Sequence, residues 1–228
     1  MAKDKIAYVC SNCGQESAKW IGKCPACGQW NTFKELRVSA DTGGQAARNA
    51  AVDVHRAMSH SGAKPMFLKD ISSQDEPRID MHDNELNRVL GGGLVRGSIV
   101  LLGGEPGIGK STLTLQTVLN MPDRRILYVS GEESAHQLKM RAMRINPNAA
   151  DNVMILCETS LEDIFKHISE VKPEFVVIDS IQTISTADVD SSPGSVTQVR
   201  ECASALLRFA KTSGVPVLLI GHINKEGN

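Results

Sequence analysis

Residues 104–111 read GEPGIGKS and fit the pattern G-x-x-x-x-G-K-[ST] at every required position. They follow the β-rich run SIVLLG at residues 98–103 and precede a segment with helical character, which is the context that a phosphate-binding loop needs. Glycines let backbone N–H groups converge on phosphate oxygens, and the start of a helix adds the positive end of its dipole. We therefore expect an α/β domain that binds a nucleoside triphosphate at this loop.

Two side chains of the loop are suited to nucleotide chemistry. Lys110 is placed to reach the β- and γ-phosphates, and the Ser111 hydroxyl is placed to bind Mg²⁺, with Thr112 as a less favoured ligand. The alternative is a glycine-rich turn with a fortuitous lysine, which leaves the flanking strand and helix unexplained. The candidate nucleotide-binding residues are Gly104, Glu105, Pro106, Gly107, Ile108, Gly109, Lys110, Ser111, Thr112 and, from a later strand, His222.

Side chains at other strand ends are candidates for catalysis. Asp179 ends the run FVVID, as a Mg²⁺-orienting acid of a P-loop enzyme does, although a helix cap is the alternative. Glu132 follows the run ILYVS, where open parallel sheets bind ligands, and can take a proton from an attacking water. For it and Glu133 the alternative is a place in the first turn of the next helix, which fits Glu133 equally well. His222 follows PVLLIG and is either a γ-phosphate sensor or a bystander.

Strand-like and helix-like segments alternate from about residue 65 onward. Five nearly continuous apolar runs are typical of strands covered on both faces, at residues 98–103, 126–130, 153–156, 175–179 and 216–221. Between them, Ser160 can cap a helix with an apolar face, and residues 195–211 repeat the pattern. This order predicts a parallel sheet flanked by helices through right-handed crossovers.

Four of the six cysteines form two C-x-x-C pairs near the N-terminus, Cys10 with Cys13 and Cys24 with Cys27. Two such knuckles supply a closed tetrahedral thiolate site, which suits structural Zn²⁺ because no position remains for water. A module of residues 1–37 is too small to fold on an apolar core alone, so zinc binding and folding should be coupled. A redox dithiol is the competing interpretation, but it usually needs one C-x-x-C on a larger sheet.

The cysteine module carries six basic side chains against three acids, and a four-thiolate zinc site reduces this local charge from +3 to about +1. Nucleic-acid binding fits that surface, with Trp20 and Trp30 as stacking platforms. The two tryptophans fit equally well as the small core of the module.

Composition limits the remaining classes of function. Formal net charge is −1, with 25 basic and 26 acidic side chains, so any nucleic-acid binding must come from a local patch. No apolar run approaches the roughly 18 residues of a membrane span, so we expect a cytoplasmic protein with no membrane partner. Cys157 and Cys202 lie in apolar segments and fit buried thiols in a reducing compartment. Residues 38–64 are small and polar and predict a flexible linker between domains at 1–37 and 65–228.

Several longer motifs resemble the RadA (Sms) family of bacterial DNA-repair proteins. They are CSNCG, CPACGQWNTF, ELNRVLGGGLVRGSIVLLGGEPGIGKST, SGEES, VVIDSIQT, PGSVTQVRECA and GHINKEG, within residues 8–37 and about 65–227. The resemblance implies a zinc finger, a RecA-like ATPase core and a Lon-like C-terminal domain. Because the chain ends at Asn228, before the family's KNRFG motif and Lon-like domain, we expect a core whose C-terminal part is truncated.

The resemblance also implies an activity and roles for particular residues. The family forms hexameric rings on single-stranded and branched DNA, and it drives branch migration of recombination intermediates with the RecA recombinase. The loop would bind ATP with Lys110, Asp179 would be the magnesium acid, and Glu132 the catalytic base. His222 would take the position that other RecA-like motors give to a glutamine, and residues 181–199 would meet DNA.

Two positions depart from the family pattern: Asn87 stands where an acid is usual, and Asn224 where threonine is usual. Three functions stay open at this point. The first is a DNA-dependent ATPase of recombinational repair, and the second is an ATP-switched regulatory module that does not translocate. The third is a zinc-dependent nucleic-acid-binding adaptor whose phosphate loop is only structural. DNA-stimulated ATP turnover separates the first from the second, and Lys110→Ala tests the third.

Overall fold

The computed structural model describes residues 5–10, 15–17, 19–26, 28–38, 66–70, 77–147 and 151–222. The chain forms two compact units, one within the first 76 residues and one from Pro77 onward. The linker expected at residues 38–64 lies outside the described residues except for Val38, and so do Cys13, Cys27 and Asn224.

The N-terminal unit contains a three-stranded antiparallel sheet in the order β2-β1-β3. Its strands are β1 (Lys5–Cys10), β2 (Glu16–Ser17) and β3 (Phe33–Val38). The buried side chains described here are Cys10, Cys24 and Phe33, and the register sets Cys10 opposite Phe33. Trp20 is 54% exposed and Trp30 is 67% exposed, so the two tryptophans do not form the core of this unit.

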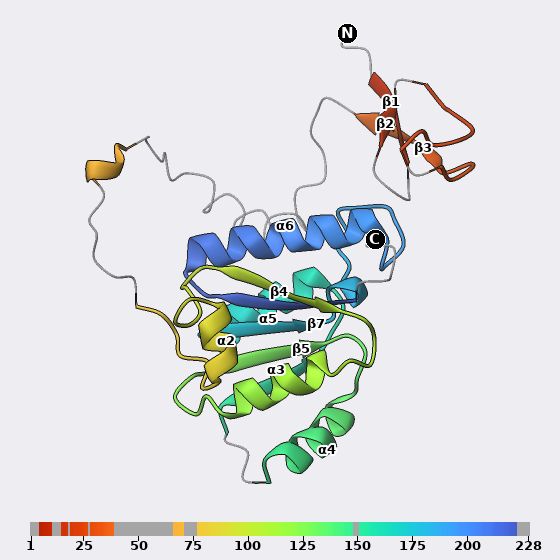
Figure 1. The fold of residues 1–228 in the computed structure, drawn as a ribbon. Helices are drawn as coiled ribbons and strands as arrows, with labels where there is room; N and C mark the ends of the chain where they lie inside the picture. Colours follow the sequence, from red (N-terminus) through yellow and green to blue (C-terminus); the bar gives the residue numbers. More distant parts are fainter. Residues whose placement is uncertain are drawn as a thin grey trace. The chain divides into compact units, whose positions relative to one another are not determined.

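The C-terminal unit is a five-stranded parallel sheet in the order β4-β8-β7-β5-β6, flanked by helices (Figure 1). Its strands are β4 (Ile99–Gly104), β5 (Ile126–Ser130), β6 (Val153–Cys157), β7 (Phe175–Asp179) and β8 (Val217–His222). The predicted α/β class and all five predicted strands are confirmed. The helices of this unit are α2 (Asn84–Val89), α3 (Lys110–Leu119), α4 (Ala135–Ile145), α5 (Leu161–Val171) and α6 (Val196–Ser213), with the 3₁₀ turn η2 (Ile181–Thr183). The 3₁₀ turn η1 (Leu68–Asp70) belongs to the N-terminal unit.

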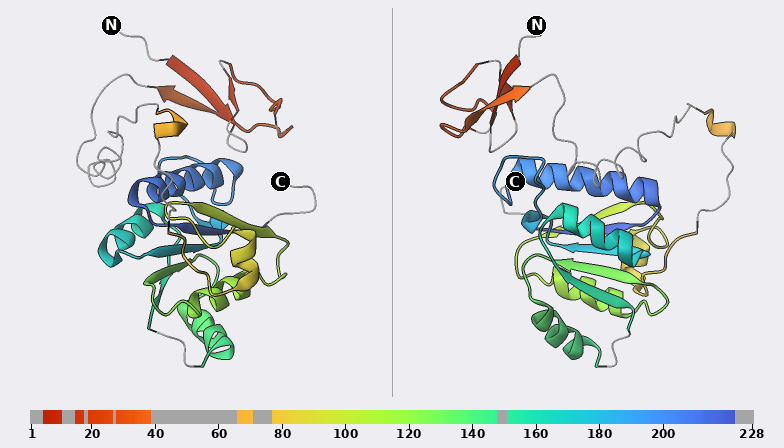
Figure 2. Two further views of the ribbon diagram at one scale, coloured as in Figure 1. Left: turned by 60° about the vertical axis from the view of Figure 1, so that its left-hand side comes forward. Right: turned by 180° about the vertical axis from the view of Figure 1, so that it is seen from behind.

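Two apolar cores lie on opposite faces of this sheet. Helices α3 and α4 pack on one face, against residues such as Tyr128 and Val177, while α5 and α6 pack on the other, against Val129 and Ile178 (Figure 2). Successive side chains of a strand point to opposite faces, so β5 and β7 contribute to both cores. This double coverage explains the nearly continuous apolar runs of the two strands, whose residues are all buried.

The strands β4 and β6 are less buried than the prediction of coverage on both faces implies. They lie at the two edges of the sheet, where each has a neighbouring strand on one side only. Both contain exposed as well as half-buried residues. The prediction of two buried thiols is therefore wrong for Cys157, which ends β6 and is exposed, while Cys202 of α6 is buried as expected. None of the described helices has the length and apolar character that a membrane span requires.

The helices begin where the sequence places polar caps. The Ser160 hydroxyl accepts a hydrogen bond from the backbone N–H of Asp163 at the start of α5, and Ser195 caps α6 in the same way. Asn87, the departure in α2, accepts from the Met81 N–H through Oδ1 and donates to Asp80 through Nδ2, at 2.7 Å. A carboxylate could not make that donation to Asp80, so asparagine suits this local contact.

Candidate functional site

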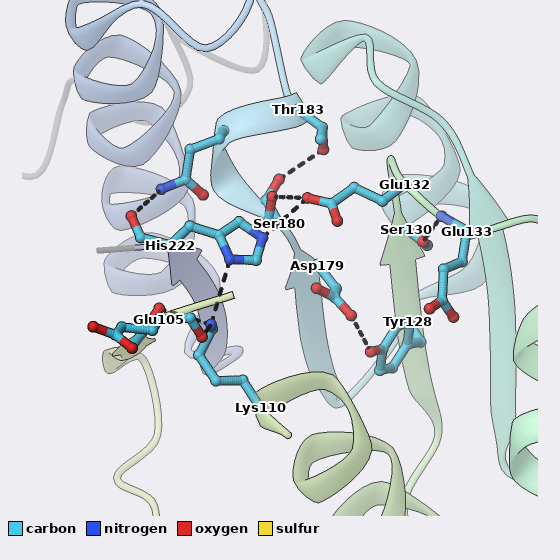
Figure 3. A network of polar contacts seen from close by, with 12 residues as sticks. Glu105, Lys110, Tyr128, Ser130, Glu132, Glu133, Asp179, Ser180, Thr183 and His222 are labelled. Carbon is cyan, nitrogen blue, oxygen red and sulfur yellow. Dashed lines mark hydrogen bonds and ion pairs between the residues drawn. The ribbon is translucent and has the colours of Figure 1, made fainter. Parts of the chain in front are cut away.

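The strand register aligns the carboxyl ends of the central strands. Gly104 of β4 pairs with His222 of β8, and Ser130 of β5 pairs with Asp179 of β7. Since all these strands are parallel, the segments that follow them start from the same edge of the sheet, where open α/β sheets bind ligands (Figure 3). Residues separated by more than a hundred positions in the chain are thereby brought together.

The predicted phosphate loop connects β4 to α3. Gly107 and Gly109 have φ angles of +77° and +103°, which glycine adopts without the strain that a Cβ would bring. Gly109 is the N-cap of α3, so the first backbone N–H groups of that helix border the loop. Residues 105–109 and Thr112 are exposed, whereas Ser111 is half-buried. This is the backbone arrangement that the motif predicts for binding an anion.

Lys110 begins α3 and is only 7% exposed. Its Nζ donates to the carbonyl oxygens of Gly104 and Glu105, each at 2.8 Å, and lies 3.4 Å from Nδ1 of His222. The ammonium is thus held over the loop by main-chain oxygens (Figure 3). Because the Lys110 side chain is itself nearly buried, these carbonyl oxygens compensate its positive charge.

Asp179 is buried at the end of β7, and the Tyr128 hydroxyl donates to its Oδ2 at 2.6 Å. Burial, and then the charge of Asp179, raise the pKa of Tyr128, so the hydroxyl remains a donor. The tyrosine therefore fixes the orientation of the carboxylate. Sequence reasoning missed Tyr128, and the available signal was a phenol hydroxyl between apolar neighbours in a fully buried strand.

Glu132 lies between two hydrogen-bonding side chains (Figure 3). Ser180 is fully buried and donates its hydroxyl to Oε1 of Glu132 at 2.7 Å, while Nε2 of His222 lies 3.2 Å from the same oxygen. The Ser180 hydrogen bond holds the pKa of Glu132 below its ordinary value, assisted by His222 and Lys110 and opposed by partial burial. The carboxylate is thus kept ionised and aimed across the carboxyl edge of the sheet.

Gly131 makes this placement of Glu132 possible. Its N–H donates to the Asp179 carbonyl at 3.0 Å, which links the β5 loop to the β7 loop. A Cβ at Gly131 would overlap Oγ1 of Thr183 and lie 2.6 Å from Thr183 Cβ. Thr183 in turn donates to the Ser180 carbonyl at 2.8 Å. Only glycine lets the two loops approach closely enough for Ser180 to reach Glu132.

Glu133 points away from this group, toward α4. It forms an ion pair with Arg141, and its N–H donates to the Ser130 hydroxyl. The alternative interpretation placed both glutamates in the first turn of the following helix. That helix, α4, starts only at Ala135, because Ser134 is its N-cap and forms a capping box with Gln137. Neither Glu132 nor Glu133 is therefore in the first turn of α4.

His222 connects the lysine of the phosphate loop to Glu132. One ring nitrogen faces Lys110 Nζ and the other faces Glu132 Oε1. The side-chain amide of Gln182 donates to the His222 carbonyl at 3.1 Å, which secures the end of β8. The structure thus brings Lys110, Glu132 and His222 into one polar network, with Asp179 beside it on β7 (Figure 3).

The N-terminal unit has a second candidate site, formed by the cysteine knuckles. Cys10 and Cys24 are buried, and each donates its N–H to the carbonyl of a glutamine five residues on, Gln15 and Gln29, at 2.9 and 2.8 Å. In both CSNCGQ and CPACGQ the first residue is thus hydrogen-bonded to the last. A buried thiol at the first position of each C-x-x-C pair fits a tetrahedral thiolate centre. Within the described residues no three His, Cys, Asp or Glu side chains form a metal group, and the second cysteine of each knuckle lies outside them.

Two family models match the chain. Residues 64–228 match the model of the AAA domain, which covers well over half of the sequence. The chain belongs to the AAA domain family. Residues 8–35 match a model described as the rubredoxin metal binding domain. The AAA domain contains the phosphate loop and every strand end described above, and the rubredoxin match contains both cysteine knuckles.

The relatives agree with the resemblance seen in the motifs. The chain is 47% identical to the DNA repair protein RadA of Bacillus subtilis and 48% identical to that of Escherichia coli, in each case over 100% of this chain and 49% of the relative. Identity to the Listeria monocytogenes protein of that name is 46%, over 99% of this chain and 48% of the relative. The predicted resemblance to the RadA family is confirmed. The chain spans about half the length of these relatives.

Proposed function

We propose that this chain binds and hydrolyses ATP as part of a DNA-repair ATPase. The observation that carries the proposal is the convergence of Lys110, Glu132 and Asp179 at one edge of the sheet, with the lysine on an anion-binding loop. These are the three groups that phosphate binding, water activation and metal binding require. Membership of the AAA domain family supports the same chemistry.

In this proposal each side chain has a distinct task. Lys110 exchanges its two carbonyl partners for oxygens of the β- and γ-phosphates, while the backbone N–H groups of the loop hold the remaining oxygens. Ser111 and Asp179 would hold Mg²⁺, which when bound neutralises charge on the phosphates. The ionised Glu132 orients a water toward the γ-phosphate and accepts its proton. His222 lies beside both groups and is placed to contact the γ-phosphate.

DNA is the proposed partner of the ATPase unit. The relatives carry the name DNA repair protein, and the loop between η2 and α6 lies at the carboxyl end of β7. Gln198 is buried and its amide holds this loop through Thr186, Val189 and Ser191. We infer that the ordered loop contacts single-stranded or branched DNA. Hexameric rings and branch migration with the RecA recombinase belong to the same proposal.

The cysteine module is proposed to bind structural Zn²⁺ through Cys10, Cys13, Cys24 and Cys27. The same hydrogen bond at the first cysteine of each pair, and the buried thiols of Cys10 and Cys24, support this assignment. The metal would hold the two knuckles together, so it would stabilise the small sheet rather than take part in ATP hydrolysis.

ATP turnover measured with and without single-stranded DNA, beside the oligomer mass, tests the proposed function. We expect Lys110→Ala to abolish turnover, and Lys139→Ala, which changes an exposed lysine of α4, to retain it. DNA-stimulated turnover that Lys110→Ala removes would support a DNA-dependent ATPase. ATP binding with turnover that DNA leaves unchanged would favour the non-translocating switch. Full activity of Lys110→Ala would refute the proposed role of the phosphate loop.

A further inference from the structure

The two tryptophans of the N-terminal unit both lie beside Gly22. A Cβ built on Gly22 would lie 3.7 Å from Cη2 of Trp20 and 3.9 Å from Cζ3 of Trp30. Both rings are more than half exposed, while the buried positions of the unit are taken by other side chains. Both rings therefore lie next to Gly22 and are open to solvent.

The backbone that carries the rings is held by the second cysteine knuckle. Lys23 and Trp30 form an antiparallel bridge, and the N–H of Asn31 donates to the Gly22 carbonyl at 2.7 Å. Cys24 then closes the knuckle through its bond to Gln29. The two aromatic residues are thus placed by the same turn that presents Cys24. If Zn²⁺ binds Cys24 as proposed, its removal should change the spacing of the two rings.

The segment that carries the rings is rich in lysine. Residues 17–34 contain Lys19, Lys23 and Lys34 but no aspartate or glutamate. The Lys23 ammonium lies 5.6 Å from the centre of the Trp30 ring, a cation–π distance, and Lys19 directly precedes Trp20. Lysines beside exposed aromatic rings combine attraction for phosphates with flat surfaces on which bases stack. An acidic protein partner would contact only the lysines, and an apolar protein partner would contact only the rings.

We propose that Trp20 and Trp30, with Lys19 and Lys23, form a stacking site for unpaired bases of single-stranded nucleic acid. The site lies wholly within the N-terminal unit and does not require ATP hydrolysis. It therefore goes beyond the proposed ATPase, whose DNA contact is placed on the loop after η2.

The test uses a convenient property of the sequence: Trp20 and Trp30 are its only tryptophans. Intrinsic fluorescence of the chain, without nucleotide, should be quenched by oligo-dT and by oligo-U, because stacking involves the base rather than the sugar. An abasic oligonucleotide of equal length should quench at least tenfold less effectively at equal concentration. Equal quenching by the abasic strand, or no quenching by any strand, would overturn the proposal.

Substitutions separate the two rings from general charge effects. By fluorescence anisotropy of a labelled oligo-dT, we expect Trp20→Ala and Trp30→Ala each to weaken binding about tenfold, and Trp20→Phe to restore most of it. Phe67→Ala is the matched control, since Phe67 is also exposed and has Lys69 over its ring at 5.5 Å, but it precedes η1 and is not part of the cysteine module. One bound Zn²⁺ per chain shows that each variant is folded.

Unchanged affinity in both folded alanine variants would overturn the site even if ATP turnover is normal. Loss of ATP turnover in the parent chain, with quenching intact, would instead refute only the proposed ATPase. Tryptophan emission that changes with protein concentration in the absence of oligonucleotide would place a second copy of the chain on the rings, and would also overturn the proposal.

Discussion

Replacing Ser180 with alanine should lower kcat for ATP about tenfold and leave ATP affinity within about twofold. Ser180 donates to the carboxylate of Glu132 at 2.7 Å and is fully buried, so water cannot replace its hydroxyl. Of these two partners, only His222 would then hold the Glu132 carboxylate in position to orient the attacking water. Because Ser180 does not touch the phosphate loop in the described contacts, binding of the nucleotide should be nearly unaffected.

The magnitude follows from the contacts of Glu132. A hydrogen bond to a charged group contributes about 1.5–3 kcal/mol. The Glu132 side chain is 45% exposed and retains its contact with His222 Nε2 at 3.2 Å. The free energy lost with the Ser180 hydroxyl should therefore lie near the lower end of that range. About 1.4 kcal/mol in the activation free energy corresponds to about a tenfold change in rate.

The pH dependence of kcat gives the sign of the effect. The Ser180 hydrogen bond is the largest cause that lowers the pKa of Glu132, and a proton acceptor must be ionised to act. In the parent chain the acidic limb of the kcat profile should therefore lie below the ordinary pH range of a glutamate. In Ser180→Ala the pKa rises toward its ordinary value, so the acidic limb should move to higher pH.

The assay is phosphate release at saturating ATP across this pH range, in a double-mutant cycle with Glu132→Gln. If Ser180 acts through Glu132, the double variant should match Glu132→Gln alone within about twofold. A further tenfold loss in the double variant would mean that Ser180 acts on another group. An unmoved acidic limb in Ser180→Ala would contradict the role assigned to its hydroxyl.

Three other changes test the site and the cysteine module. Tyr128→Phe removes the donor to buried Asp179 and should lower the free energy of unfolding by about 1–3 kcal/mol, with Mg²⁺–ATP recovering part of the loss in a thermal melt. Gly131→Ala forces a Cβ against Thr183 and should lower the free energy of unfolding by about 1–3 kcal/mol in the same thermal melt. It should also lower kcat, since Glu132 is displaced. Chelation of the metal should release one Zn²⁺ per chain and expose the N-terminal unit to protease, while ATP affinity stays within twofold; an intact unit after zinc loss would argue against a structural site.

The strands and caps were predictable because their causes are local. Strands β5 and β7 run over the residues that the apolar segments predict, since each is buried on both faces. Ser160 and Ser195 cap helices as expected, because a cap involves only the next three residues. The phosphate loop is local for the same reason, and its strand–loop–helix context is confirmed.

The partners of the site residues were not predictable, because they depend on the order of the strands in the sheet. Ser180 reaches Glu132 only because β7 lies next to β5, although β6 comes between them in the chain. The pair of Tyr128 and Asp179 depends on the same neighbourhood. The exposure of Cys157 has a similar origin, since an apolar run does not reveal that its strand is the last in the sheet.

The main-chain bonds of Lys110 have a consequence for how ligands are discriminated. Its ammonium already has two oxygen acceptors, at Gly104 and Glu105, so a nucleotide gains only the difference between those acceptors and its own. The β- and γ-phosphate oxygens of ATP carry more negative charge than the two carbonyls, so Lys110 binds them more strongly. ADP lacks the γ-phosphate, so Lys110 gains less when it exchanges the carbonyls for ADP. We expect Lys110 to raise the affinity for ATP by a larger factor than the affinity for ADP, which competition between the two nucleotides in the parent and Lys110→Ala chains would measure.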